Sequence, residues 1–191
     1  MRPFSALTED LALPGEAAGE DVSSRLSRMA TAHLESVWRT LRRLGVPPAD
    51  IDDAVQQVFL AVVPRLGELP PPREHAYLLG IAVRIASNWR RTHRRRREVF
   101  HAPLPDEGDD QAGPEATLEQ KQIRRLLDQA LDTLPQELRV VFVLFELEEL
   151  SMSEIARLLD LPPGTVASRL RRAREQFQEQ ARSQLDEPGE A

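Results

Sequence analysis

Residues 151–174 read SMSEIARLLDLPPGTVASRLRRAR and contain two short helical patterns separated by a break. The first pattern covers Ser153 to Asp160, and the break is Leu161–Gly164, where two prolines and a glycine interrupt the helix. The second helix is expected to begin at Thr165 and is rich in arginine. Two short helices joined by a tight turn predict a helix-turn-helix motif. The apolar positions of the second helix recur at i, i+4, i+7 and i+11, at Val166, Leu170, Ala173 and Phe177.

This narrow apolar stripe predicts that the second helix exposes most of its surface. Small residues near its start would let the helix approach a major groove, and arginine can bond guanine in a bidentate way or neutralise phosphate. A solvated arginine face on an ordinary helical hairpin is the alternative. At 100° per residue the outward positions are Ala167, Ser168, Arg171 and Arg172, with Arg174 at the flank.

The preceding sequence indicates further helices and no strand-like alternation. A helix is expected from about Ser24 to Leu44, and Asp50 is a candidate N-cap for the next one, which Pro64 ends. That helix carries an amphipathic stripe, and a second stripe follows a proline-rich break. The first stripe is Ile51, Ala54, Val55, Val58, Phe59, Val62 and Val63, and the second is Tyr77, Leu78, Ile81, Ala82, Ile85, Ala86 and Trp89.

The chain therefore divides into two helical blocks. Residues 98–117 are acidic, contain Pro and Gly, and lack any period, so they are expected to form a flexible linker. A helix near Leu118 to Leu131 follows, and Pro135 opens another. The prediction is an all-α protein with domains at 24–97 and 118–182, the second containing the helix-turn-helix, between a weakly ordered tail at 1–23 and a polar tail at 183–191.

Charge is distributed unevenly over the 191 residues, whose net charge is −6. Residues 25–97 hold 14 arginines against 6 acidic residues, whereas residues 98–120 hold 7 acidic residues and no base. Six arginines and a histidine occupy residues 90–97 directly after a helical stripe. A basic segment in an acidic chain indicates an anionic partner that is met locally.

Several classes of function are disfavoured. The chain has no cysteine, its four histidines are scattered, and no phosphate loop or nucleophile motif occurs, so we expect no enzyme, metal or other cofactor. No run approaches the roughly 18 to 20 apolar residues of a membrane span, and acidic residues occupy the N-terminus where a signal peptide needs an apolar core. A cytoplasmic protein that binds no membrane is expected.

Two sets of residues allow alternative interpretations. Tyr77 and Trp89 fit the apolar stripe and so suit core packing, but if exposed they could stack on unpaired bases. The paired carboxylates Asp52 and Asp53 could serve acid–base chemistry. Acidic residues are favoured in the first turn of any helix, however, so a polar face offered to a protein partner is the preferred interpretation.

These motifs resemble those of the extracytoplasmic-function sigma factors of the sigma-70 family, over about residues 25–182. The resemblance is most specific at Leu134-Pro135, Arg139, Ser153–Ala156 and Gly164–Arg174, which are similar to the segment that reads the minus-35 promoter element. Residues 52–60, DDAVQQVFL, are similar to the segment that binds core RNA polymerase. The helix 76–97 resembles the segment that melts and reads the minus-10 element.

The resemblance implies a bacterial transcription initiation factor that binds core RNA polymerase and promoter DNA, with an anti-sigma factor as a further partner. The implied minus-35 contacts are Thr165, Ala167, Ser168, Arg169, Arg171, Arg172 and Arg174. The implied minus-10 contacts are Tyr77, Arg84, Asn88, Arg90, Arg91, Arg94 and Arg95. The implied polymerase contacts are Asp52, Asp53, Gln56, Gln57 and Phe59.

Two other classes of protein share single features with this sequence. A helix-turn-helix regulator that is not a sigma factor would have a different sequence after Thr165-Val166 and would lack the block from Asp53 to Phe59. An RNA-binding protein could use the arginine run, but it would leave residues 151–174 unexplained.

Overall fold

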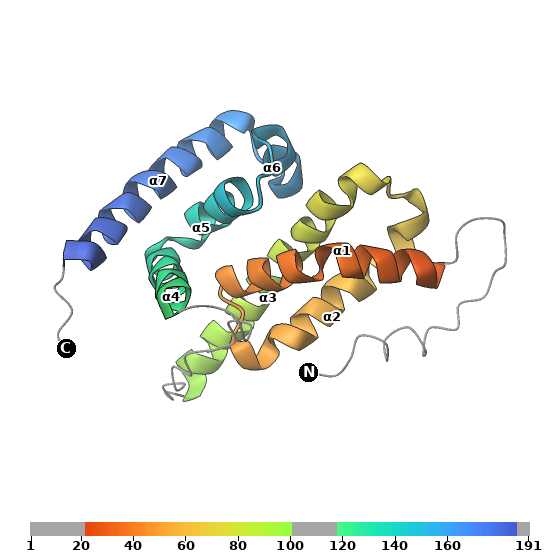
Figure 1. Cartoon of the computed structure of the whole chain (residues 1–191), viewed down its shortest axis with the longest axis horizontal. Coiled ribbons are helices and arrows are strands. Elements are labelled where there is room, and N and C mark those ends of the chain that lie inside the picture. The colour runs from red at the N-terminus through yellow and green to blue at the C-terminus, as the bar shows by residue number, and fades with distance from the viewer. Residues whose placement is uncertain (1–21, 101–117, 187–191) are drawn as a thin grey trace.

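The computed structural model describes residues 22–100 and 118–186, and within these ranges the chain forms helices and turns without any strand. Figure 1 shows two groups of helices, one built from α1 to α3 and the other from α4 to α7. The expected all-α fold is confirmed.

The first group contains α1 (Val22–Arg43), α2 (Ile51–Val62) and α3 (Glu74–Phe100). Short 3-10 turns at Pro48–Asp50, Val63–Glu68 and Pro71–Arg73 join these helices. Each turn has proline in its first two positions, where the missing N–H costs nothing.

The end of α1 depends on a glycine. Gly45 has a φ of 85°, in the left-handed region that non-glycine residues rarely adopt. In this conformation the Val46 amide donates a 3.1 Å hydrogen bond to the Leu41 carbonyl. The chain therefore turns sharply after α1, and Val46 enters the core.

The predicted apolar stripes form the core of this group. The stripe of α2 is buried as expected except for Val63, which is partly buried, and Asp50 occupies the N-cap position without a side-chain cap hydrogen bond. In α3, Ile85 and Trp89 are partly buried, whereas Tyr77 is 37% exposed. The stripe residues of α3 that are fully buried are Leu78, Ile81, Ala82 and Ala86.

The second group contains α4 (Leu118–Thr133), α5 (Gln136–Phe142), α6 (Met152–Leu159) and α7 (Pro163–Asp186). A π-helical turn, Val143–Leu147, continues α5, and no sequence pattern predicts it. Phe142 of α5 stacks on Phe177 of α7 with ring centroids 4.6 Å apart. This contact and the burial of Val166, Leu170 and Ala173 fix α7 against α5.

Two helices extend past the domain boundaries expected from the sequence. The helix α3 continues to Phe100, three residues into the expected linker, and no proline or glycine interrupts the sequence between residues 90 and 100. The helix α7 continues to Asp186, past the start of the expected tail at residue 183, because no proline or glycine interrupts it there. The remainder of the expected linker, residues 101–117, and the outer parts of both expected tails lie outside the described residues.

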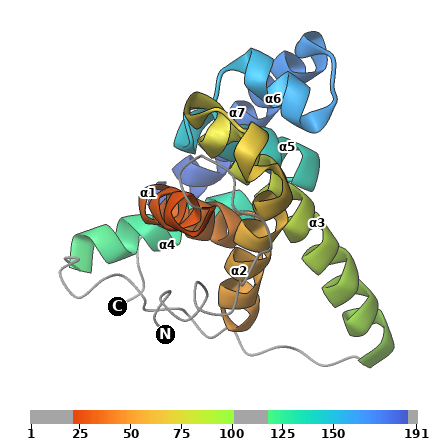
Figure 2. The ribbon, with the colours of Figure 1, turned by 90° about the vertical axis from the view of Figure 1, so that its right-hand side faces the viewer.

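The two groups pack against each other. In Figure 1, α4 lies near the end of α1 and α6 lies near the start of α3, and the view in Figure 2 agrees. Figure 2 also shows that the C-terminal end of α3 projects away from both groups.

Candidate nucleic-acid and polymerase interfaces

Two local features define the start and the end of α6, the first helix of the predicted motif. Ser151 caps α6 with a capping box, in which its hydroxyl accepts from the Glu154 amide and the Glu154 carboxylate accepts from the Ser151 amide at 2.9 Å. Hydrogen bonds from the side chain and backbone of Ser151 hold the pKa of Glu154 below its usual value. Asp160 ends α6 in the left-handed conformation with a φ of 53°. The predicted helix-turn-helix is therefore present.

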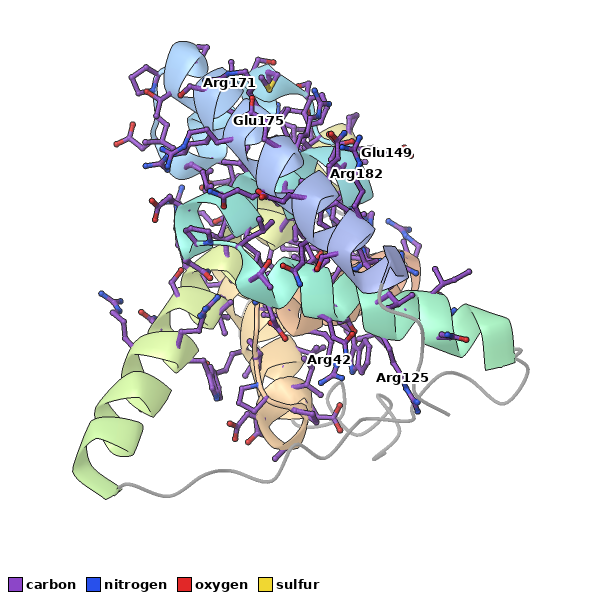
Figure 3. The ribbon with its side chains drawn as sticks, turned by 90° about the vertical axis from the view of Figure 1, so that its left-hand side faces the viewer. Arg42, Arg125, Glu149, Arg171, Glu175 and Arg182 are labelled. Carbon is purple, nitrogen blue, oxygen red and sulfur yellow. The ribbon has the colours of Figure 1, made fainter. Side chains whose placement is uncertain are left out.

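The outward face of α7 is open to solvent. Ser168 is exposed, and its hydroxyl donates to the Thr165 carbonyl at 2.9 Å, so it does not project far from the helix. The Arg171 guanidinium pairs with the Glu175 carboxylate at 2.7 Å, and both side chains are more than half exposed. Figure 3 shows Arg171 and Glu175 near the same end of α7. Ala167 and Arg172 are also exposed, as the helical periodicity predicts.

Arg174 and Arg169, unlike Arg171, contact side chains from outside α7. The Arg174 Nε donates to the Glu146 carboxylate at 2.6 Å, and its guanidinium lies 5.3 Å from the centre of the Phe145 ring. Arg169 is half-buried in a shallow groove that it shares with Val83 and Ser87 of α3. The sequence pattern does not distinguish these two arginines from Arg171, because their partners come from distant segments.

The exposed positions of α3 follow one another along the helix. Tyr77, Arg84 and Asn88 are all exposed, and Arg91 donates to the Asn88 side chain. Arg90 behaves differently, since it is partly buried and donates to Gln136 of α5. The side chains of Arg94 and Arg95 lie outside the described residues.

The polar face of α2 is exposed, with one exception among the predicted contacts. Asp52, Asp53, Gln56 and Gln57 all face solvent. The exception is Phe59, which is 3% exposed and belongs to the core. Phe59 falls on the buried side of the stripe, so its predicted contact with polymerase stays a prediction from the sequence. Leu60 is 43% exposed beside the polar face and was missed by the periodicity argument.

A buried carboxylate joins the two groups of helices. The Glu148 side chain is 3% exposed and accepts a 2.6 Å hydrogen bond from the Ser36 hydroxyl of α1. His75 lies 2.8 Å from the same hydroxyl through Nε2, and the Arg43 guanidinium lies 3.4 Å from the other carboxylate oxygen. Burial alone would raise the pKa of Glu148, but hydrogen bonds from His75 and Ser36 bring it below its usual value. No sequence pattern predicts this contact.

Metal-binding clusters and membrane-spanning helices are both absent from the described parts of the chain. Residues 22–100 and 118–186 contain no group of three or more His, Asp or Glu side chains that could hold a metal ion. Among these helices none is long and apolar enough to cross a membrane.

Comparison with known proteins assigns both groups of helices. Residues 29–96 match the family described as sigma-70 region 2, and residues 124–177 match sigma-70 region 4. A relative described as ECF RNA polymerase sigma-E factor, from Escherichia coli strain K12, is 31% identical over 139 residues, which cover 68% of this chain and 73% of the relative. The chain belongs to the sigma-70 family of transcription initiation factors.

Other similar proteins support the same family assignment. The ECF RNA polymerase sigma factor SigE of Mycolicibacterium smegmatis is 30% identical over 151 residues, which cover 77% of this chain and 58% of the relative. Two solved structures share the fold. CnrH in complex with the cytosolic domain of CnrY has a TM-score of 0.60 at 22% identity, with 84% of this chain and 88% of that chain covered. RpoE in complex with the anti-sigma factor NepR, from Bartonella quintana, has a TM-score of 0.68 at 17% identity, with 82% and 96% covered.

The protein is thus a sigma factor that directs RNA polymerase to promoters. The match to region 2 over residues 29–96 sets aside the alternative of a helix-turn-helix regulator that is not a sigma factor, because such a regulator would have no use for this domain. Sigma factors are initiation factors rather than enzymes, so the expectation of a non-enzymatic protein agrees with the family.

Proposed function

We propose that the exposed face of α7 reads the minus-35 element, that the exposed face of α3 reads the melted minus-10 element, and that α2 binds core RNA polymerase. The observation that carries the proposal is the outward face of α7, where two small residues precede exposed arginines. Small side chains allow the helix to enter the major groove, and arginine donates to the acceptors of guanine. The residues proposed for this reading are Thr165, Ala167, Ser168, Arg171 and Arg172.

The proposal that α3 reads the minus-10 element rests on the side chains that this helix exposes to solvent. Tyr77 presents an aromatic ring at the surface, and such a ring can stack on an unpaired base. Arg84, Asn88 and Arg91 follow it along the helix and can contact the backbone or base edges. Arg94 and Arg95 remain candidates from the sequence.

The polymerase assignment rests on the polar face of α2, formed by Asp52, Asp53, Gln56 and Gln57. Exposed Leu60 adds an apolar residue beside this face. A mixed polar and apolar surface on a rigid helix is suited to a protein partner.

The proposal also covers a regulatory partner and the cellular location of the protein. The titles of the two similar structures name complexes with CnrY and with an anti-sigma factor, so we extend to this chain the expectation of an anti-sigma partner. A role with RNA polymerase places the protein in the cytoplasm, and it requires no catalytic activity of its own.

The experiment compares promoter preference in holoenzymes that carry wild-type protein or Arg171→Ala. Transcription is measured from promoters in which every base of the minus-35 element is varied. Loss of a bidentate contact should cost about 1–3 kcal/mol and relax preference at one base position. Arg182→Ala is the matched control, because Arg182 is exposed near the far end of the same helix. Identical profiles for wild type and Arg171→Ala would exclude base reading by Arg171.

A further inference from the structure

The connecting segment between α2 and α3, residues 63–73, leaves one of its own carbonyl groups without a local donor. Prolines occupy positions 70, 71 and 72 and have no N–H to donate. The first two amides after them, of Arg73 and Glu74, each donate to the carbonyl three residues earlier. The carbonyl of Leu69, a residue in the extended conformation with a φ of −88° and a ψ of 111°, therefore needs a donor from another part of the chain.

Arg25 of α1 supplies this donor. Its guanidinium donates to the Leu69 carbonyl and pairs with the Glu74 carboxylate at 3.0 Å. The side chains of Arg25 and Glu74 are only 19% and 13% exposed, so solvent screens this pair less than an ion pair on an open surface. Glu74 lies in the first turn of α3, where the helix dipole also favours a carboxylate. A single arginine thus joins α1, the connecting segment and the start of α3.

Apolar packing fixes only the first part of the connecting segment. Leu66 and Leu69 are buried in the core, whereas residues 71–73 are exposed. An open groove of about 510 Å³ is lined by Met29 on α1 and by Pro71 on the connecting segment, so side chains do not fill the space between them. Figure 1 shows this segment beside the first turns of α1 and leading into α3. The last turn of the segment is therefore oriented mainly by the two bonds of Arg25.

The helical turn that Arg25 holds also carries Tyr77. Glu74 and Tyr77 are three residues apart, so they lie on the same side of α3, one turn from each other. The first N–H groups of a helix lack intrahelical partners, so this turn opens more readily than the middle of the helix. Fully buried side chains begin at Leu78 and fix the rest of α3 against the core. The orientation of the Tyr77 ring therefore depends on the Arg25–Glu74 pair, whereas that of the later exposed positions does not.

We propose that Arg25 is a positioning residue for minus-10 recognition. Through the Leu69 carbonyl and the Glu74 carboxylate, it holds the first turn of α3 in the orientation that presents the Tyr77 ring to an unpaired base. The guanidinium of Arg25 bonds to the protein, so it acts through Tyr77 and not by contact with DNA. The proposal rests on the proposed stacking of Tyr77 and adds a supporting residue that no sequence motif indicates.

A double-mutant cycle in promoter opening tests this role. Holoenzymes carry wild-type protein, Arg25→Ala, Tyr77→Ala or both changes, and opening is measured by the permanganate reactivity of unpaired thymines. Arg25→Ala should lower the equilibrium for opening by about threefold to tenfold. In the Tyr77→Ala background the same change should have little further effect, because the ring that Arg25 orients is absent. A residue that only stabilises the fold would give the same factor in both backgrounds.

Two further variants sharpen the comparison. Glu74→Gln removes the ion pair but leaves the hydrogen bond from Arg25 to the backbone, so it should give a smaller loss of opening that also disappears in the Tyr77→Ala background. This milder change supplies the test if Arg25→Ala does not fold. Arg39→Ala is the matched control and should leave opening unchanged, because Arg39 lies on the same helix but pairs with Glu35, one turn earlier.

The possible results distinguish the positioning role from the stacking itself. Equal factors in the two backgrounds, or full opening by both Arg25→Ala and Glu74→Gln, would overturn the positioning role and leave the stacking of Tyr77 intact. A loss of opening by Arg39→Ala as large as that by Arg25→Ala would overturn it as well, since the effect would then belong to any arginine of α1. Full opening by Tyr77→Ala would overturn the stacking and the positioning role together.

Discussion

Arg174 offers a test of whether a residue in the recognition helix reads DNA or positions the helix. Its guanidinium joins α7 to the π turn through Glu146 and lies over the Phe145 ring. We predict that Arg174→Ala lowers the free energy of unfolding and weakens all minus-35 sequences by a similar factor. The profile of base preference should keep its shape.

The magnitude follows from the two contacts. The Arg174–Glu146 pair is 2.6 Å long, and its side chains are 48% and 30% exposed, so it contributes about 0.2–1 kcal/mol. The cation–π contact at 5.3 Å adds about 0.5–1 kcal/mol. Arg174→Ala should therefore cost about 1–2 kcal/mol. By contrast, Arg171→Ala removes only the exposed pair with Glu175 and should cost no more than about 0.5 kcal/mol.

Urea denaturation of the full chain measures these differences, and a double-mutant cycle with Glu146→Ala isolates the ion pair. The salt dependence of promoter binding by the holoenzyme supplies the second readout. From the sequence alone, Arg174 is expected to neutralise a phosphate, and its loss would then reduce the salt slope by about one. An unchanged free energy of unfolding together with that reduced slope would refute the positioning role.

The other predictions concern the partners. Asp53→Arg should weaken binding to core polymerase in a pull-down titration while costing only about 0.3–1 kcal/mol of stability at the helix start, whereas Glu35→Arg on α1 should leave binding unchanged; equal affinities would remove Asp53 from the interface. Tyr77→Ala should destabilise the open promoter complex by about 1–3 kcal/mol, measured by the permanganate reactivity of unpaired thymines, whereas Tyr77→Phe should retain opening because the ring still stacks. A defect in both variants would point to the hydroxyl instead. The free protein should bind promoter duplex weakly at physiological salt, because the 7 acidic residues of 98–120 compete with phosphate for the basic segment, and tight specific binding in a filter assay would contradict this.

Local sequence signals predicted the helices well because each is encoded by nearby residues. The stripe of α2 is buried where the periodicity places it. The break before α7 is shorter than the expected Leu161–Gly164, because α7 already begins at Pro163, a position in the first turn that proline tolerates. The exposure of Arg171 and Arg172 also follows from the helical repeat alone.

Contacts between distant segments could not be predicted in this way. Glu148 reads as one more acidic residue in a polar turn, and only the packing of region 4 on α1 buries it. Arg139 belongs to a motif shared with the family, yet its bond to the Arg43 carbonyl depends on the two regions being in contact. The burial of Phe59 follows from the apolar stripe, whereas the motif match does not state which side of the helix faces the core.

Run-off transcription tests the central claim most directly. Purified core RNA polymerase is mixed with the full chain and with fragments of genomic DNA, and the transcripts are mapped at their 5′ ends. We expect discrete start sites that depend on this protein and that share two sequence elements upstream, near positions minus-35 and minus-10. Transcripts identical to those of core polymerase alone would contradict the account.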